Sequence, residues 1–307
     1  MSRFVSYAQN YEDVILWRAL GHVKDGFFVD CGAYDPTCHS VTKAFYDRGW
    51  RGINIEPIPS LLREFALQRP SDVNLNIALS DKSDYATFYE IVDTGLSTFS
   101  QQIANSHIEA GFEARSMIVQ TATLSNVLEQ FSQDAIHFLK IDVEGAEELV
   151  LAGLDLQKFR PWVILVEATK PRSGEPNHQD WESGLLSQGY DFVYFDGLNR
   201  FYVSHDHPEL RLPLALPPNI FDNFVQIEQL DEVVRLQIQL ATLKNSTSWR
   251  LTSPLREGKL FLRALRTHLR FIGMDLASRF RSRSTANSKP TGLGKLPKHV
   301  GGLAPSA

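Results

Sequence analysis

The chain of 307 residues contains only two cysteines, Cys31 and Cys38, and no cluster of histidines accompanies them. This excludes a framework of disulfide bonds and a zinc site with the usual spacing of cysteine and histidine ligands. The chain also lacks an uncharged apolar run of about eighteen residues, and it does not begin with a basic segment followed by an apolar core. We therefore expect a cytoplasmic protein with neither a membrane-spanning helix nor a secretory signal peptide.

Positive charge is scarce in the first 243 residues, which hold 18 Lys and Arg against 34 Asp and Glu, a net charge of −16. Residues 244–307 reverse this balance with 13 Lys and Arg against 2 Asp and Glu, a net charge of +11. Because nucleic acids are bound largely by neutralising phosphates, we expect no nucleic-acid binding by the acidic part. With 43% hydrophobic and 22% charged residues, the whole chain has the composition of a globular protein with a full core.

The pattern of apolar residues predicts an α/β fold. Short apolar runs bounded by turn residues predict strands at 27–31, 52–56, 73–78, 137–142, 162–167, 191–196 and 200–204. Apolar residues three and four positions apart predict helices at 40–48, 60–68, 124–131, 145–152 and 179–188. A short turn with Gly197 and Asn199 joins the last two runs, which is typical of an antiparallel hairpin. Residues 85–122 predict an inserted pair of strands, and we expect the turn at 95–100 to overhang a ligand crevice.

The run FFVDCGAYDP, residues 27–36, predicts a binding turn. It ends in Asp30 and turns through Gly32 and Ala33, while the next run, GINIEP, ends in Glu56. Glycine lets the backbone approach a ligand closely, and an acid at the end of the second strand can accept both hydroxyls of a ribose. Together these features favour a nucleoside cofactor. The alternative is an ordinary turn glycine beside a helix-capping acid.

The same turn lacks the later glycines of a dinucleotide fingerprint, because Tyr34, Asp35 and Pro36 stand in that region. A pyrophosphate would therefore meet Asp35 instead of open backbone amides. An acidic turn suits a cofactor with an amine and a sulfonium, and S-adenosylmethionine has both. Asp30 or Asp35 could accept hydrogen bonds from the methionine ammonium.

Further apolar runs also end in an acid. If the strands are parallel and covered by helices, their carboxyl ends lie at one edge of the sheet, where ligands bind. We therefore expect a common edge to carry Asp30, Glu56, Asp81, Asp142 and Glu167.

The chain resembles the FkbM family of S-adenosylmethionine-dependent methyltransferases over residues 5–204. The resemblance is carried by YAQNYEDVIL, VDCGAYDP, RGINIEP, NIALSD, GLST, FLKIDVEGAE, ILVEAT and FDGLNRFYV. It implies a class I, Rossmann-like fold, with a seven-stranded, mostly parallel sheet, a terminal antiparallel hairpin and helices on both faces.

The resemblance also implies which residues bind the cofactor. The turn of Asp30, Gly32 and Ala33 would hold the methionine part, and Glu56 the ribose. The corner formed by Ala78, Ser80 and Asp81 would hold the adenine. The segment with Gln9 and Asn10 would fold over the methionine end, or Asn10 could simply cap a helix.

Methyl transfer to oxygen requires a base for the hydroxyl proton. Asp142 is the first candidate for the reaction centre, and Lys140 lies two residues earlier on the same strand face. Glu144 could act there, or it could be an acid at a helix N-terminus. Glu167 and His178 are further candidates for the base. Asp142, Glu144 and Glu167 would also allow a Mg²⁺ site, but no spacing motif requires one, and we assign no metal.

The organisation changes after residue 221. We expect a methyltransferase domain at 1–221, a helical segment at 222–281 and a disordered basic tail at 282–307. A heptad-like spacing at the start of the helical segment suggests a coiled coil, with apolar residues Ile227, Leu230, Val234, Ile238 and Leu240. Residues 255–281 predict a basic amphipathic helix, which could bind the inner face of a membrane or a partner protein.

We thus expect an O-methyltransferase that modifies a sugar hydroxyl in polysaccharide or glycoconjugate biosynthesis, and oligomers are compatible with this. One alternative is an NAD(P)-dependent oxidoreductase or sugar epimerase, which the missing glycines and the lack of a Tyr-x-x-x-Lys pair disfavour. Another is a non-catalytic assembly module. Acids at the ends of several apolar runs argue against it, since a degenerate site would not need them.

Overall fold

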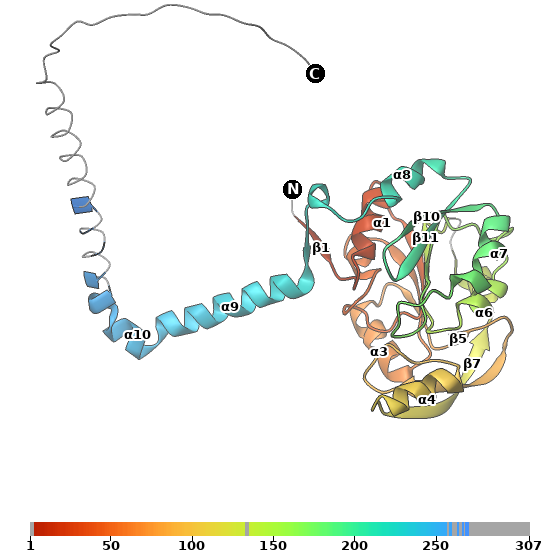
Figure 1. Cartoon of the computed structure of the whole chain (residues 1–307), viewed down its shortest axis with the longest axis horizontal. Coiled ribbons are helices and arrows are strands. Elements are labelled where there is room, and N and C mark those ends of the chain that lie inside the picture. The colour runs from red at the N-terminus through yellow and green to blue at the C-terminus, as the bar shows by residue number, and fades with distance from the viewer. Residues whose placement is uncertain are drawn as a thin grey trace, which may run out of the picture. The chain divides into compact units, whose positions relative to one another are not determined.

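The computed structural model describes residues 3–132, 135–256, 258–259, 263, 266 and 268–269 (Figure 1). The chain divides into a first unit that ends at Glu232 and a second that begins at Val233. The expected boundaries at residues 221 and 281 remain predictions. The structure does keep residues 224–226 in the first unit, because strand β12 (Phe224–Gln226) pairs in parallel with β1 (Phe4–Ser6).

A seven-stranded mixed sheet forms the centre of the first unit, in the order β10-β11-β9-β8-β2-β3-β4. Its strands are β2 (Phe27–Cys31), β3 (Arg51–Ile55), β4 (Val73–Leu75), β8 (Phe138–Ile141), β9 (Val163–Glu167), β10 (Tyr190–Phe195) and β11 (Asn199–Ser204). The four pairs from β9 to β4 are parallel, and β11 pairs antiparallel with both β9 and β10. The expectation of an α/β fold with seven strands in one sheet is confirmed.

Helices cover both faces of this sheet (Figure 1). One apolar cluster packs α1 (Glu12–Leu20), α2 (Lys43–Tyr46) and α8 (Arg211–Leu214) against one face, and another packs α5 (Leu124–Phe131), α6 (Glu147–Ala152) and α7 (Glu182–Ser187) against the other. In β2, Phe28 belongs to the first cluster and Val29 to the second. A strand buried on both faces reads as a continuous apolar run, and for this reason the sequence predicted the central strands well.

A separate three-stranded sheet has the order β5-β7-β6. It contains β5 (Ala78–Leu79), β6 (Asp84–Ile91) and β7 (Ala114–Ala122), and α4 (Gln101–Glu109) lies between the last two. The expected inserted pair is confirmed, since β6 and β7 are antiparallel. The single strand expected at 73–78 is wrong: β4 ends at Leu75, and Ala78 instead pairs with Thr121 of β7.

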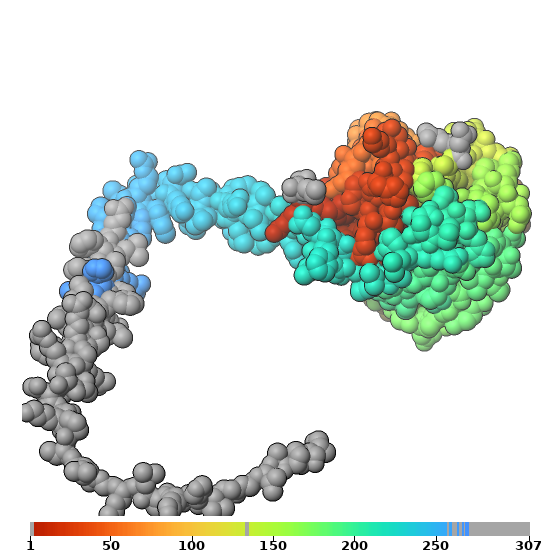
Figure 2. All heavy atoms as spheres, turned by 90° about the horizontal axis from the view of Figure 1, so that it is seen from above, coloured from red at the N-terminus to blue at the C-terminus, as the bar shows by residue number. Residues whose placement is uncertain are grey.

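The start of the chain is fixed to the segment that follows β11, and Figure 2 shows these two parts in contact. Arg18 of α1 forms an ion pair with Asp222 at 2.7 Å and donates to the carbonyl oxygens of Pro213 and Leu216. Asn10 is not the cap of α1, because the cap is Tyr11 in a left-handed conformation and no side chain caps it.

The other helices are α3 (Pro59–Gln68), α9 (Ile227–Asn245), α10 (Thr247–Leu251) and three short 3-10 turns, His178–Asp180, Pro208–Leu210 and Ile220–Asp222. None of the residues of α9 is buried, and a coiled coil remains a prediction. Most of the expected amphipathic helix at 255–281 and all of the tail at 282–307 lie outside the described residues. Within the described part of the chain, no helix has the length and apolar character needed to span a membrane.

Candidate active site

A cavity of about 380 Å³ opens where β2, β3 and β8 end. The chain runs from β2 outward through β3 to β4 and later returns to β8 on the other side of β2, so the cavity lies at the switch point of the sheet, where α/β folds bind ligands. Its lining includes Gln9, Glu12, Gly32, Ala33, Tyr34, His39, Glu56, Ile58, Ala78, Leu79, Phe88, Asp93, Leu96, Phe99, Lys140, Asp142, Glu144 and Leu198.

The turn after β2 can be formed only with glycine at position 32. Gly32 has a φ of 76°, and a Cβ atom there would lie 1.8 Å from the carbonyl oxygen of Asp142. The backbone N–H groups of Gly32 and Ala33 both donate to the carbonyl oxygen of Ile55 at 3.1 Å. The end of β3 and the residue after β8 therefore hold this turn in place, and Gly32 and Ala33 line the cavity.

Glu56 is buried at the end of β3, with 5% of its surface exposed. One carboxylate oxygen accepts the N–H of Tyr34 at 3.0 Å, and the other accepts the N–H of Ile58 at 2.8 Å. Burial raises the pKa of Glu56 to about 7, against the lowering effect of these two donors. Each oxygen keeps a further lone pair that can accept a ligand hydroxyl.

Lys140 connects the turn to the acids. The register of β2 and β8 sets Asp30 opposite Lys140. The ammonium group of Lys140 donates to the carbonyl oxygen of Gly32 at 2.9 Å and lies 3.3 Å from the carboxylates of both Asp30 and Asp142. Burial alone would lower the pKa of Lys140, but the charges of Asp142 and Asp30 outweigh burial and raise it. Lys140 therefore carries its charge and is fully engaged within the protein.

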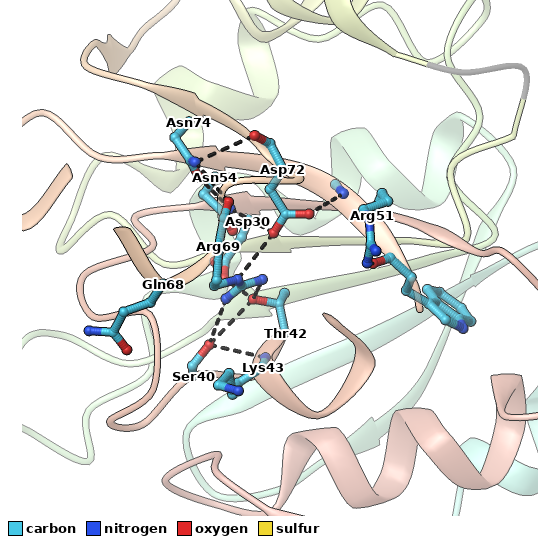
Figure 3. A network of polar contacts seen from close by, with 12 residues as sticks. Asp30, Ser40, Thr42, Lys43, Arg51, Asn54, Gln68, Arg69, Asp72 and Asn74 are labelled. Atoms are coloured by element: carbon cyan, nitrogen blue, oxygen red, sulfur yellow. Dashed lines mark hydrogen bonds and ion pairs between the residues drawn. The ribbon is translucent and has the colours of Figure 1, made fainter. Parts of the chain in front are cut away.

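Asp30 does not line the cavity and belongs to a buried polar network (Figure 3). Its second carboxylate oxygen accepts the hydroxyl of Thr42 at 3.0 Å. Arg69 donates to Thr42 at 2.9 Å and pairs with Asp72 at 3.1 Å. This network holds one carboxylate oxygen of Asp30, so the other oxygen can orient the ammonium group of Lys140.

Asp142, Glu144 and Glu167 converge beside Lys140. One carboxylate oxygen from each lies within 4.8 Å of the other two. Burial and the charge of Asp142 raise the pKa of Glu144 to about 9 and that of Glu167 to about 11. Glu144 is not an acid of the helix N-terminus, because α6 begins only at Glu147.

Several predicted site residues do not line the cavity. Asn10 donates to the carbonyl oxygen of Asp196 at 3.1 Å, and Asp35 closes its own turn by accepting the N–H groups of Thr37 and Cys38. Ser80 donates to Asp81 at 3.1 Å, while the preceding Ala78 and Leu79 reach the cavity instead. His178 has its nearest ionic partner in Glu182, at 3.8 Å. The roles assigned to these residues remain predictions.

Other lining residues were not among the predicted ones. Glu12 is buried and accepts the N–H of Asn10 and the side-chain amide of Asn199, both at 2.8 Å. Burial and the charge of Asp196 raise the pKa of Glu12 to about 8. Its partner Asn199 lies 187 residues away, and no local pattern could reveal that contact.

Four lining residues other than glycine have a left-handed backbone, with φ values between 53° and 58°: Tyr34, His39, Asp93 and Glu144. Such strain persists only where the surroundings enforce it, and it concentrates at binding sites. No sequence pattern indicated this feature, because none of the four is a glycine.

One family model matches the chain. The model of the methyltransferase FkbM domain matches residues 30–192. The structure of a methyltransferase FkbM from Methylobacillus flagellatus is 15% identical with a TM-score of 0.37, and the match covers 62% of this chain and 47% of that chain. This chain thus spans about half the length of that relative.

The structure of a TehB-like SAM-dependent methyltransferase from Corynebacterium glutamicum is 11% identical with a TM-score of 0.36, and the match covers 63% of this chain and 88% of that chain. A search of curated proteins found no match. Since the family model covers more than half of the 307 residues, the chain belongs to the FkbM methyltransferase family.

Proposed function

We propose that this chain is an S-adenosylmethionine-dependent O-methyltransferase. The observation that supports this best is the acidic lining of the cavity. Among the described residues that line it, five are acids, Glu12, Glu56, Asp93, Asp142 and Glu144, and the one lysine or arginine is Lys140. Lys140 is already bound to Asp30, Asp142 and a backbone carbonyl. Such a cavity offers no further cation to the pyrophosphate of a nicotinamide cofactor. A ligand with positive charge would favour the ionised forms of Glu12 and Glu144, whose pKa values burial raises to about 8 and about 9.

The residues present fit S-adenosylmethionine in three places. The turn of Gly32 and Ala33 lines the cavity, and Glu56 has free lone pairs for the two ribose hydroxyls. Gln9 and Glu12 could hold the methionine ammonium. An apolar part of the cavity suits the adenine ring and is formed by Ile58, Leu61, Ala78, Phe88 and Phe99.

When bound, S-adenosylmethionine supplies a methyl group on a sulfonium sulfur, which an oxygen nucleophile can displace. The chain's own part is to orient the acceptor hydroxyl and to take its proton. Asp142 is suited to accept that proton, because its side chain is 32% exposed and Lys140 fixes its carboxylate at 3.3 Å. Glu144, which also lines the cavity, could form a hydrogen bond with another hydroxyl of the acceptor.

We extend the proposal to a sugar hydroxyl as the acceptor. The support is the group of carboxyl side chains at Asp142, Glu144 and Glu167, because neighbouring hydroxyls of a sugar can each form a hydrogen bond with a carboxyl group. A cytoplasmic location and an attachment of the basic tail to a membrane surface belong to the same proposal.

Isothermal titration calorimetry of the full chain tests the cofactor. We expect binding of S-adenosylmethionine and none of NAD or NADP, and the reverse result would contradict the proposal. Transfer of a labelled methyl group to a panel of glycans then tests the reaction. Asp142→Asn should retain most of the cofactor affinity while transfer falls by about 10²–10⁴-fold. The exposed Asp155→Asn serves as control, and transfer at the normal rate by Asp142→Asn would remove Asp142 from this role.

A further inference from the structure

Three carboxylates from separate positions converge on one point beside the cavity. Asp142 follows β8 directly, Glu144 lies in the next turn, and Glu167 is the last residue of β9. One oxygen of each lies within 4.8 Å of the others. Oxygen ligands that surround a single ion at about 2.0–2.6 Å are separated by about 3–5 Å from one another. The spacing is therefore that of a shared cation.

Glu167 gives independent support for a ligand at this point. Its side chain is buried, with 6% of its surface exposed, and its oxygen Oε2 has no hydrogen-bond partner among the described residues. The oxygen Oε2 of Glu144 is likewise buried without a partner in the part of the chain that the structure describes. Leaving a buried carboxylate oxygen without a donor is costly, so buried polar atoms of this kind normally have a partner.

Three other side chains nearby that can donate hydrogen bonds are engaged elsewhere. Lys140 binds Gly32, Asp30 and Asp142. Asn199 stands opposite Glu167 in the register of β11 and β9, but its amide donates to Glu12 and Asp196. The hydroxyl of Thr98 donates to the backbone carbonyl of Glu144 and not to its carboxylate. A cation would supply the missing partner for both glutamates at once.

We propose that Asp142, Glu144 and Glu167 form a binding site for a hard divalent cation of the Mg²⁺ or Mn²⁺ type. Three carboxylate ligands leave coordination positions open on the side of the cavity, since Asp142 and Glu144 line it. Oxygen-rich sites with open positions are typical of these ions. The binding itself is independent of the proposed function. The use of the site rests on that function: the ion would hold two neighbouring hydroxyls of the acceptor and lower the pKa of the one to be methylated.

Mn²⁺ titration of the full chain tests the site without cofactor or acceptor. Calorimetry and the loss of the free-ion signal in electron paramagnetic resonance should both show one site near neutral pH. Glu167→Gln should weaken Mn²⁺ binding by at least about ten-fold, because it removes one of three carboxyl ligands that lose their protons when they bind the ion. Glu148→Gln, an exposed acid of α6, is the matched control and should bind as the unaltered chain does.

Glu144→Gln gives a second test on a less buried residue and should weaken binding to a similar extent, so the proposal stays testable if Glu167→Gln does not fold. An absence of Mn²⁺ binding, or equal affinity in both glutamate variants and the control, would overturn it. Binding of S-adenosylmethionine is measured separately in chelator. If the cofactor binds and Mn²⁺ does not, the cation site is wrong and the proposed function stands. If Mn²⁺ binds and the cofactor does not, the proposed function is wrong and the cation site stands.

Discussion

The Cα of Gly32 faces the carbonyl oxygen of Asp142 so closely that a Cβ atom would lie 1.8 Å from it. The oxygen belongs to the backbone of Asp142, so no movement of a side chain could relieve such a clash. The cofactor turn and the reaction centre are thus joined through the main chain of two adjacent strands.

Gly32→Ala should therefore destabilise the chain by about 3 kcal/mol or more, since the clash adds to the strain of a left-handed backbone. The Gly49→Ala variant separates the effect of the clash from the effect of the left-handed backbone. Gly49 also has a left-handed backbone, with φ at 95°, but a Cβ atom there meets nothing within 4 Å. We expect that control to cost only about 1–2 kcal/mol in the free energy of unfolding, measured with denaturant. An equal loss of stability in both variants would show that the turn can shift enough to relieve the clash.

Glu56→Gln should weaken binding of S-adenosylmethionine by about ten-fold or more. The reason is the loss of charge-assisted hydrogen bonds to the two ribose hydroxyls, worth about 1.5–3 kcal/mol in total. Glu64→Gln on the exposed face of α3 is the control. Calorimetry gives the two affinities, and circular dichroism shows whether the fold is kept. An unchanged affinity of a folded Glu56→Gln variant would remove Glu56 from the ribose site.

The sequence predicted the central sheet and two of the acids at its edge because their signals are local. The strands expected at 27–31, 52–56, 137–142 and 162–167 agree with β2, β3, β8 and β9 within one residue or so. Each is buried on both faces and ends at the carboxyl edge of the sheet, where Glu56 and Asp142 line the cavity.

What the sequence could not predict depends on contacts between distant segments. Glu12 of α1 lines the cavity and is held there by Asn199 of β11, far away in the sequence. The pairing of β5 with β7 places Ala78 and Leu79 at the cavity instead of Asp81. Asp35 illustrates a different difficulty. An acid in a turn can bind a ligand or close the turn itself, and here it accepts two backbone N–H groups of its own turn.

Arg69→Ala should destabilise the chain by about 3–5 kcal/mol, because it leaves the charge of Asp72 buried without its partner. Both side chains are fully buried, and the guanidinium also stacks over the ring of Phe28. Arg63→Ala, at an exposed position of α3, is the control and should change little. Denaturant unfolding measures both. A small loss for Arg69→Ala would mean that water replaces the guanidinium and that the network in Figure 3 is not a rigid support for Asp30.

Glu12 should make the stability of the chain depend on pH. Burial raises its pKa in the folded chain to about 8 from an ordinary value of 4.5. Between these two values the unfolded chain has released the proton that the folded chain keeps, so the contribution of Glu12 is full below about pH 4.5 and is lost as the pH rises through about 8. A glutamine at position 12 cannot ionise, so the Glu12→Gln variant does not lose this contribution to stability as the pH rises.

As the pH rises from about 5 to about 8, the unaltered chain should therefore lose stability that Glu12→Gln keeps. The difference in the free energy of unfolding should shift in favour of Glu12→Gln by about 1–4 kcal/mol. Denaturant unfolding at both pH values measures this difference, in which the titration of all other groups largely cancels. Glu148→Gln is the control, and its difference from the unaltered chain should stay constant across the same range. If the curves of Glu12→Gln and the unaltered chain run parallel, Glu12 is already ionised in the folded protein. Its carboxylate would then stand ready as an anion for the methionine ammonium at neutral pH, without first losing a proton.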